Sequence, residues 1–205
     1  MVAASHFELL VEEDSTGAFF QTLLPRILPA TCTFTVHPFQ GKDDLLSKLE
    51  ARLKGYASWL PPDWRIVVAL DRDDDDCIDL KRRMEVFAKR AGLRSRTQAR
   101  GSDWQVVNRV TVEELEAWYF GDWVAVRSAY PRVSAHVPQR QGLRDPDAIR
   151  GGTWEAFERQ MQRAGYFKGR LRKIEAARAI AAQFRPGQNT SSSFRVFHAA
   201  LMEAI

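Results

Sequence analysis

Aspartates crowd the chain directly after a short apolar segment. Residues 67–70 read VVAL, and five of the next six positions, 71–76, are aspartate. Carboxylates at this spacing repel one another, so a folded protein that brings them together holds protons or cations there. Oxygen ligands without a neighbouring His or Cys cluster favour Mg²⁺ or Mn²⁺ over zinc. The spacing therefore predicts Asp71 and Asp73 as metal ligands.

Glu12 closes another apolar segment, HFELLVE, and offers a third carboxylate. In an open parallel sheet, ligands bind beyond the carboxyl ends of the strands. If the first and third predicted strands are neighbours, Glu12, Asp71 and Asp73 converge on one small volume. A divalent ion there would activate a water and neutralise charge on a phosphoryl oxygen. The competing interpretation is helix capping, which we assign to one of the aspartates at 74–76 because they open the next helix.

The elements that would position these residues alternate along the first part of the chain. Hydrophobic patterns predict strands at 6–12, 31–37, 65–70 and 104–112, with helices between them at 15–28, 43–60 and 77–92. Such alternation is typical of a parallel sheet with helices on both faces. Later segments have helical patterns, at 112–130, 153–165, 169–184 and 192–204, and a long loop covers 131–147. We therefore expect an α/β fold: a mostly parallel four-stranded sheet flanked by helices (1–112), with a helical C-terminal extension (113–205) packed on it as one compact unit.

Two further glutamates follow the fourth predicted strand. Glu114 and Glu116 lie in VEELEAW, close to the same edge of the expected sheet. They could ligate a second metal ion, because two-metal sites need more than three carboxylates. An acidic first helical turn, favoured by the helix dipole, explains them equally well.

Charge is segregated along the chain although its net charge is only +4. Acids concentrate in the first half, whereas bases concentrate in KRRMEVFAKRAGLRSRTQAR and FKGRLRKIEAAR. A basic surface around an acidic pocket suits a polyanion held by its phosphates. We expect nucleic acid, DNA in preference to RNA, held by Arg82, Lys89, Arg90, Arg94, Arg96 and Lys168. The alternative interpretation is that all six basic side chains lie on solvated helix faces and bind no ligand.

The N-terminal residues MVAASHFELLVEED do not have the basic start of a signal peptide, and no apolar run is long enough to span a membrane. Two cysteines, outside any CxxC pair, are too few for a disulfide framework. We expect a cytoplasmic protein without a membrane partner. The sequence leaves the oligomeric state open.

With these residues in place, the chain resembles the Toprim domain, in which a glutamate after the first strand and a DxD after the third bind Mg²⁺. It resembles more closely a prokaryotic, itself Toprim-like family known as a domain of unknown function, DUF4276. That resemblance rests on LLVEEDSTGAFFQTLLPRIL, FQGKDDLLSKL, VVALDRDDDDC, VTVEELEAWYFGD, YFKG and SSSF. It implies a Rossmann-like fold, with Asp71 and Asp73 holding metal and Glu12 as ligand or general acid/base. VEEDS lacks the glycine usual after the Toprim glutamate, which leaves the choice between Glu12 and Glu13 open.

The resemblance also implies functions. Among Toprim proteins, the overcoming-lysogenization-defect nucleases are the nearest analogy, which suggests a Mg²⁺-dependent nuclease or phosphodiesterase in phage defence. Related nucleases are fused to an ATPase, but this sequence has no GxxxxGK[ST] loop, so an ATPase partner would be encoded separately. A second hypothesis is a non-catalytic adaptor or regulatory subunit of such a complex. A third, a receiver-like signalling domain, ranks low because the sequence turns helical after the fourth predicted strand.

Overall fold

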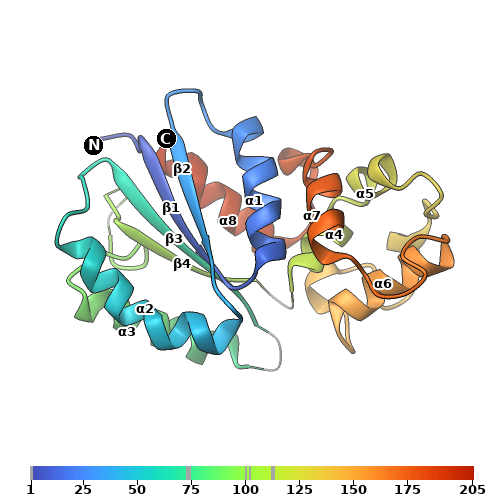
Figure 1. Cartoon of the computed structure of the whole chain (residues 1–205), viewed down its shortest axis with the longest axis horizontal. Helices are drawn as coiled ribbons and strands as arrows, with labels where there is room; N and C mark the ends of the chain where they lie inside the picture. Colours follow the sequence, from blue (N-terminus) through green and yellow to red (C-terminus); the bar gives the residue numbers. More distant parts are fainter. Residues whose placement is uncertain (1, 73–74, 100, 102, 112–113) are drawn as a thin grey trace.

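A computed structural model describes residues 2–72, 75–99, 101, 103–111 and 114–205 (Figure 1). The predicted alternation of strands and helices is confirmed in the first part of the chain, and helices follow. The elements are β1 (His6–Val11), α1 (Asp14–Ile27), β2 (Thr33–Pro38), α2 (Lys42–Ala57), β3 (Trp64–Asp71), α3 (Cys77–Arg90), β4 (Val106–Thr111), α4 (Leu115–Gly121), α5 (Trp123–Ala129), α6 (Thr153–Arg163), α7 (Lys173–Ala181) and α8 (Ser192–Ala204), with the 3-10 turns η1 (Val137–Gln139), η2 (Pro146–Ala148) and η3 (Pro186–Gln188).

The sheet has the strand order β2-β1-β3-β4, and all three pairings are parallel. The expectation that the first and third strands are neighbours is therefore confirmed. β1 and β3 are buried almost throughout, as their apolar runs predict. β2 alternates between exposed and half-buried residues because it lies at the sheet edge.

Helices cover both faces of the sheet (Figure 1). One face packs against α1 and α8, where Phe7, Leu9 and Val11 of β1 join Phe20 and Phe197 in one hydrophobic cluster. The other face packs against α2 and α3 in a second cluster. This distribution follows from the period of two along each strand, which sends alternate side chains to opposite faces.

The predicted helix 112–130 is wrong as a single element, because the chain breaks at Gly121 into α4 and α5. A Cβ atom on Gly121 would lie 2.3 Å from Oδ1 of Asn189, so the residue permits a close approach of the segment before α8. Asp122 then caps α5 by accepting a hydrogen bond from the Ala125 amide at 3.2 Å. The break has a tertiary cause that local periodicity does not contain.

The segment around η2 is tied to the start of α8. The Asp147 carboxylate accepts hydrogen bonds from the hydroxyls of Ser191 and Ser193, both at 2.8 Å, and from the Ser192 amide at 2.5 Å. Ser191 is the N-cap of α8, and its hydroxyl accepts from the Phe194 amide. The serine run in SSSF therefore anchors a distant loop as well as starting a helix.

The hydrophobic cluster beneath α1 also contains Trp118 of α4, Phe157 of α6 and Ala177 of α7. It therefore contains side chains from both regions expected from the sequence, 1–112 and 113–205. Within the described residues, no helix combines the length and the apolar character needed to cross a membrane.

Candidate active site

The carboxyl ends of β1 and β3 meet where the chain connections diverge to opposite faces of the sheet. In sheets of this topology the crevice at that switch point is the usual ligand site. Glu12 follows β1 directly and Asp71 is the last residue of β3. The backbone N–H of Asp71 donates a hydrogen bond to Oε2 of Glu12 at 2.9 Å. The structure thus brings together two acidic residues that lie 59 positions apart in the sequence.

Local backbone contacts fix the start of this crevice. The amide of Gly41 donates to the Glu12 carbonyl at 2.9 Å, which ties the turn after β1 to the residue before α2. Gly41 has a φ of 99°, a conformation that residues with a Cβ atom rarely adopt. Glu13 is the N-cap residue of α1, and its carboxylate accepts a hydrogen bond from the Ser15 hydroxyl.

Burial and mutual repulsion dominate the electrostatics of the carboxylates. Burial, followed by the fields of Glu12 and Glu116, raises the pKa of Asp71 well above its ordinary value. Glu13 and Glu114 act in the same direction. Burial also raises the pKa of Glu116 to about 7, although Lys173 opposes that effect. The fold therefore concentrates more negative charge here than it can keep ionised without cations.

Glu114 has a structural role besides its charge. Its Oε2 accepts a hydrogen bond from the Trp154 amide at 2.7 Å, in the first turn of α6. A carboxylate at that place satisfies an orphan amide and suits the helix dipole. Glu116 is 2% exposed and is the more enclosed of the two glutamates.

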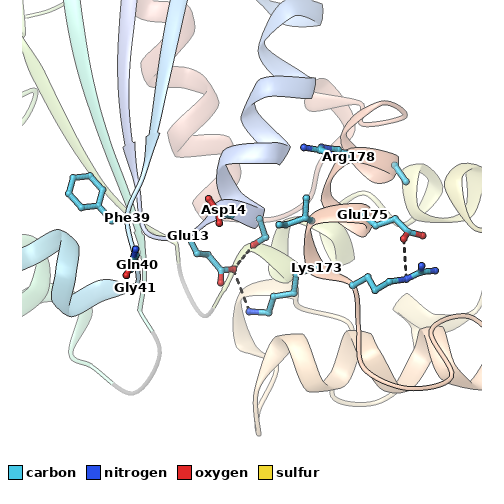
Figure 2. Close-up of a pocket in the computed structure, with 12 residues that line it drawn as sticks. Glu13, Asp14, Phe39, Gln40, Gly41, Lys173, Glu175 and Arg178 are labelled. Atoms are coloured by element: carbon cyan, nitrogen blue, oxygen red, sulfur yellow. Dashed lines mark hydrogen bonds and ion pairs between the residues drawn. The ribbon is translucent and has the colours of Figure 1, made fainter.

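Lys173 at the start of α7 supplies a cation to the same cluster. Its Nζ lies 3.4 Å from Oε1 of Glu13, and Figure 2 shows the two side chains meeting between α1 and α7. Burial acts to lower the pKa of Lys173, but the fields of the surrounding carboxylates, led by Glu116 and Glu13, outweigh it and raise the pKa. The cluster comprises Glu12, Glu13, Asp71, Glu114 and Glu116, and we call it the acidic cluster below.

Two cavities border the acidic cluster without sharing a lining residue. Cavity A, of about 1130 Å³, is lined by Glu13 and by one side of α7, including Arg172, Lys173 and Arg178 (Figure 2). Cavity B, of about 830 Å³, is lined by Arg72, Glu114 and the segment 147–152, including Arg150. Both volumes are within or above the range of small-molecule sites.

The donor chemistry of the acidic cluster fits a hard divalent cation. All its side-chain donors are carboxylate oxygens, and burial, followed by the fields of neighbouring carboxylates, raises the pKa of Asp71. No three His, Cys, Asp or Glu side chains within the described part of the chain lie close enough to hold one metal ion. Mg²⁺ commonly uses only one or two carboxylates, with waters and substrate phosphates completing its shell. Glu12 and Asp71 satisfy that smaller requirement, and Asp73 lies outside the described residues.

Four of the six basic residues predicted to bind nucleic acid pair with acids outside the acidic cluster. Arg94 and Arg96 precede β4, at the amino end of a strand that spans roughly 20 Å. Most of the set pair with carboxylates of their own: Arg82 with Asp79, Arg90 with Glu50, Arg94 with Asp103 and Arg96 with Glu203. Lys89 and Lys168 are exposed. Within the described residues, none of the six forms a hydrogen bond or an ion pair with the acidic cluster.

The expectation that an aspartate at 74–76 caps a helix has a definite outcome. Asp76 is the N-cap of α3, and its Oδ1 accepts from the amides of Ile78 and Asp79. This confirms the capping interpretation for one member of the range 74–76.

The cations of cavities A and B, above all Lys173, had no local sequence signal, because only the tertiary fold brings α7 to the ends of β1 and β3.

A second polar cluster lies under the edge of the sheet. The buried carboxylate of Glu8 accepts from the Tyr56 hydroxyl at 2.9 Å and contacts ring nitrogens of His6 and His37 at 3.2 and 2.5 Å. His6 also contacts the Thr33 hydroxyl at 2.6 Å. These contacts satisfy a carboxylate that would otherwise be buried at high cost. We assign this cluster a structural role.

Comparison with known proteins gives a family without an assigned activity. Residues 11–202 match the family described as Domain of unknown function (DUF4276). No curated protein and no solved structure matches the chain.

Proposed function

The chain belongs to the DUF4276 family, and we propose that it is a Mg²⁺-dependent phosphodiesterase acting on nucleic acid, with its active site at the acidic cluster. One observation carries the proposal: the hydrogen bond from the Asp71 amide to Glu12 joins two acids at the switch point of a parallel sheet. Charge of this density in a crevice is typical of sites that hold cations.

Each residue of the cluster has a role in this proposal. Glu12 and Asp71 would hold Mg²⁺ or Mn²⁺, which supplies Lewis-acid stabilisation of charge on a phosphoryl oxygen when bound. Glu12 already has its Oε2 fixed by the Asp71 amide, so its second oxygen is oriented by the fold. Lys173, which lines cavity A, would donate a hydrogen bond to a phosphate that enters it. Glu116, with a pKa of about 7, exchanges a proton with its surroundings near neutral pH.

The resemblance to Toprim nucleases suggests the wider setting. We propose DNA in preference to RNA as substrate, a role in phage defence and a separately encoded ATPase as partner. Asp73, Glu114 and the possibility of a second metal ion belong to the same proposal. These suggestions rest on analogy between families and not on contacts in this chain.

A cleavage assay tests the proposal. The purified protein is incubated with single- and double-stranded DNA and RNA, with Mg²⁺ or Mn²⁺ and with EDTA. We expect metal-dependent cleavage that the Asp71→Asn and Glu12→Gln variants abolish while their circular dichroism spectra stay native. The matched control is Asp79→Asn, which removes an exposed carboxylate on α3. Full cleavage by Asp71→Asn, or none by the wild type under any condition, contradicts the proposal.

A second candidate function is a non-catalytic adaptor of a partner ATPase. Lys173 favours it, because the chain supplies its own cation to the carboxylates. Mn²⁺ binding by calorimetry, combined with the cleavage assay, separates the two functions. Metal binding that Asp71→Asn removes, together with cleavage, supports the enzyme; metal binding without cleavage of any substrate supports an adaptor that keeps the metal site.

A further inference from the structure

The two cavities that flank the acidic cluster differ in lining but share one feature. Each contains an exposed arginine whose side chain makes no hydrogen bond or ion pair within the described residues: Arg178 in cavity A and Arg150 in cavity B. Elsewhere on the surface, arginines such as Arg90 and Arg94 are paired with carboxylates. An unpaired guanidinium in a concave site remains available for an anionic ligand.

The positions of these two arginines suit a long anionic ligand that extends past the acidic cluster. Arg178 lies on α7 beyond Lys173, on the cavity wall that Figure 2 shows facing Glu13. Arg150 precedes Gly151 and Gly152, in the segment that lines cavity B beside Glu114. The acidic cluster reaches both cavities, because Glu13 lines one and Glu114 lines the other.

We propose that a single nucleic-acid strand runs through both cavities across the acidic cluster, with Arg178 and Arg150 binding phosphates on either side of the reacting one. This inference rests on the proposed function and names the substrate as an internal linkage of a flexible strand. Cavity A adds Phe39 and Ile174, which provide apolar surface for a base beside the cations.

Burial of the acids favours a single strand over a duplex. Asp71 is 7% exposed and Glu116 is 2% exposed, so a phosphate must enter the crevice to approach them. A flexible strand can bend into such a recess, whereas a stiff duplex presents its phosphates on a broad cylinder. The test must therefore distinguish binding of a duplex from binding of a single strand.

The binding test uses variants that remove one charge each. Fluorescence anisotropy of a labelled 12-nucleotide DNA strand is measured in EDTA, where metal-dependent cleavage cannot occur, over a series of salt concentrations. We expect Arg178→Gln and Arg150→Gln each to weaken binding and to reduce the slope of log K against log salt by about 0.7, and the double variant by about 1.4. The matched control is Arg163→Gln, at the exposed end of α6 and outside both cavities; it keeps the wild-type slope.

A cleavage arm separates this inference from the proposed function. Bis(p-nitrophenyl) phosphate is too short to reach both arginines, so the ratio of strand cleavage to hydrolysis of this short substrate should fall in the double variant and stay at the wild-type value in Arg163→Gln. If the wild type shows no metal-dependent hydrolysis, that result counts against the proposed function. The salt slopes of strand binding still test the path of the strand. Unchanged slopes in both arginine variants, an equal loss in Arg163→Gln, or tighter binding of a duplex than of the strand overturns the inference.

Discussion

Replacing Glu116 by glutamine tests whether the acidic cluster is as strained as its environment implies. The pKa of this buried carboxyl is about 7, against an ordinary value of 4.5. Between those two pH values the folded chain binds more protons than the unfolded chain, so stability falls as pH rises. The two values differ by about 2.5, and each unit corresponds to ~1.4 kcal/mol, so the wild type loses about 3 kcal/mol between pH 4.5 and 7 at this residue.

The Glu116→Gln variant should not show this fall in the free energy of unfolding, because its side chain does not ionise. We expect Glu116→Gln to be more stable than the wild type by up to about 3 kcal/mol at pH 8 and to gain almost nothing at pH 4.5. Urea unfolding in EDTA, at pH values from 4.5 to 8, measures the difference. The control Glu175→Gln, which removes an exposed carboxylate of α7, should follow the wild type across the range. Parallel pH profiles for the wild type and Glu116→Gln would refute the reasoning.

Three further substitutions test the contacts around the site. Ser191→Ala removes the N-cap of α8 and should lower the free energy of unfolding by about 1–2 kcal/mol, seen as a lower urea midpoint. Tyr56→Phe removes a donor to the buried Glu8 carboxylate, and we expect a loss of about 1.5–3 kcal/mol in the same assay, with no change implying that water replaces the hydroxyl. Phe197→Ala opens the cluster beneath α1 and should cost about 3–5 kcal/mol by thermal unfolding. Val196→Ala, on the exposed side of α8, is its control, and an equal effect of the two would contradict the packing argument.

Much of the sheet could be predicted because its signals are local. Strands β1 and β3 are apolar runs, β2 shows the alternation of an edge strand, and each carries its side chains with a period of two. The approach of Glu12 to Asp71 then needed one further assumption, that β1 and β3 are neighbours. The observed strand order confirms that assumption, and residues after adjacent parallel strands meet at one edge of the sheet.

The rest depends on contacts between distant segments. Nothing near Lys173 in the sequence indicates that its ammonium faces Glu13, 160 positions away. The break at Gly121 depends on Asn189, and periodicity on either side continues as though the helix were whole. Composition gives the number of basic side chains but not which of them pair with a carboxylate. Arg96, which pairs with Glu203, is an example.

The order of residues around the acidic cluster has a consequence for synthesis. Its carboxylates lie at residues 12–116, whereas Lys173, the cation that Glu13 contacts, is translated much later. A nascent chain on the ribosome can pair β1, β3 and β4 before α7 has emerged. During that interval Asp71 and Glu116 face their neighbours without the ammonium, so closing the crevice is unfavourable and water should stay in it. We therefore expect the negative charge of the crevice to be offset only after α7 docks and brings the Lys173 ammonium to Glu13.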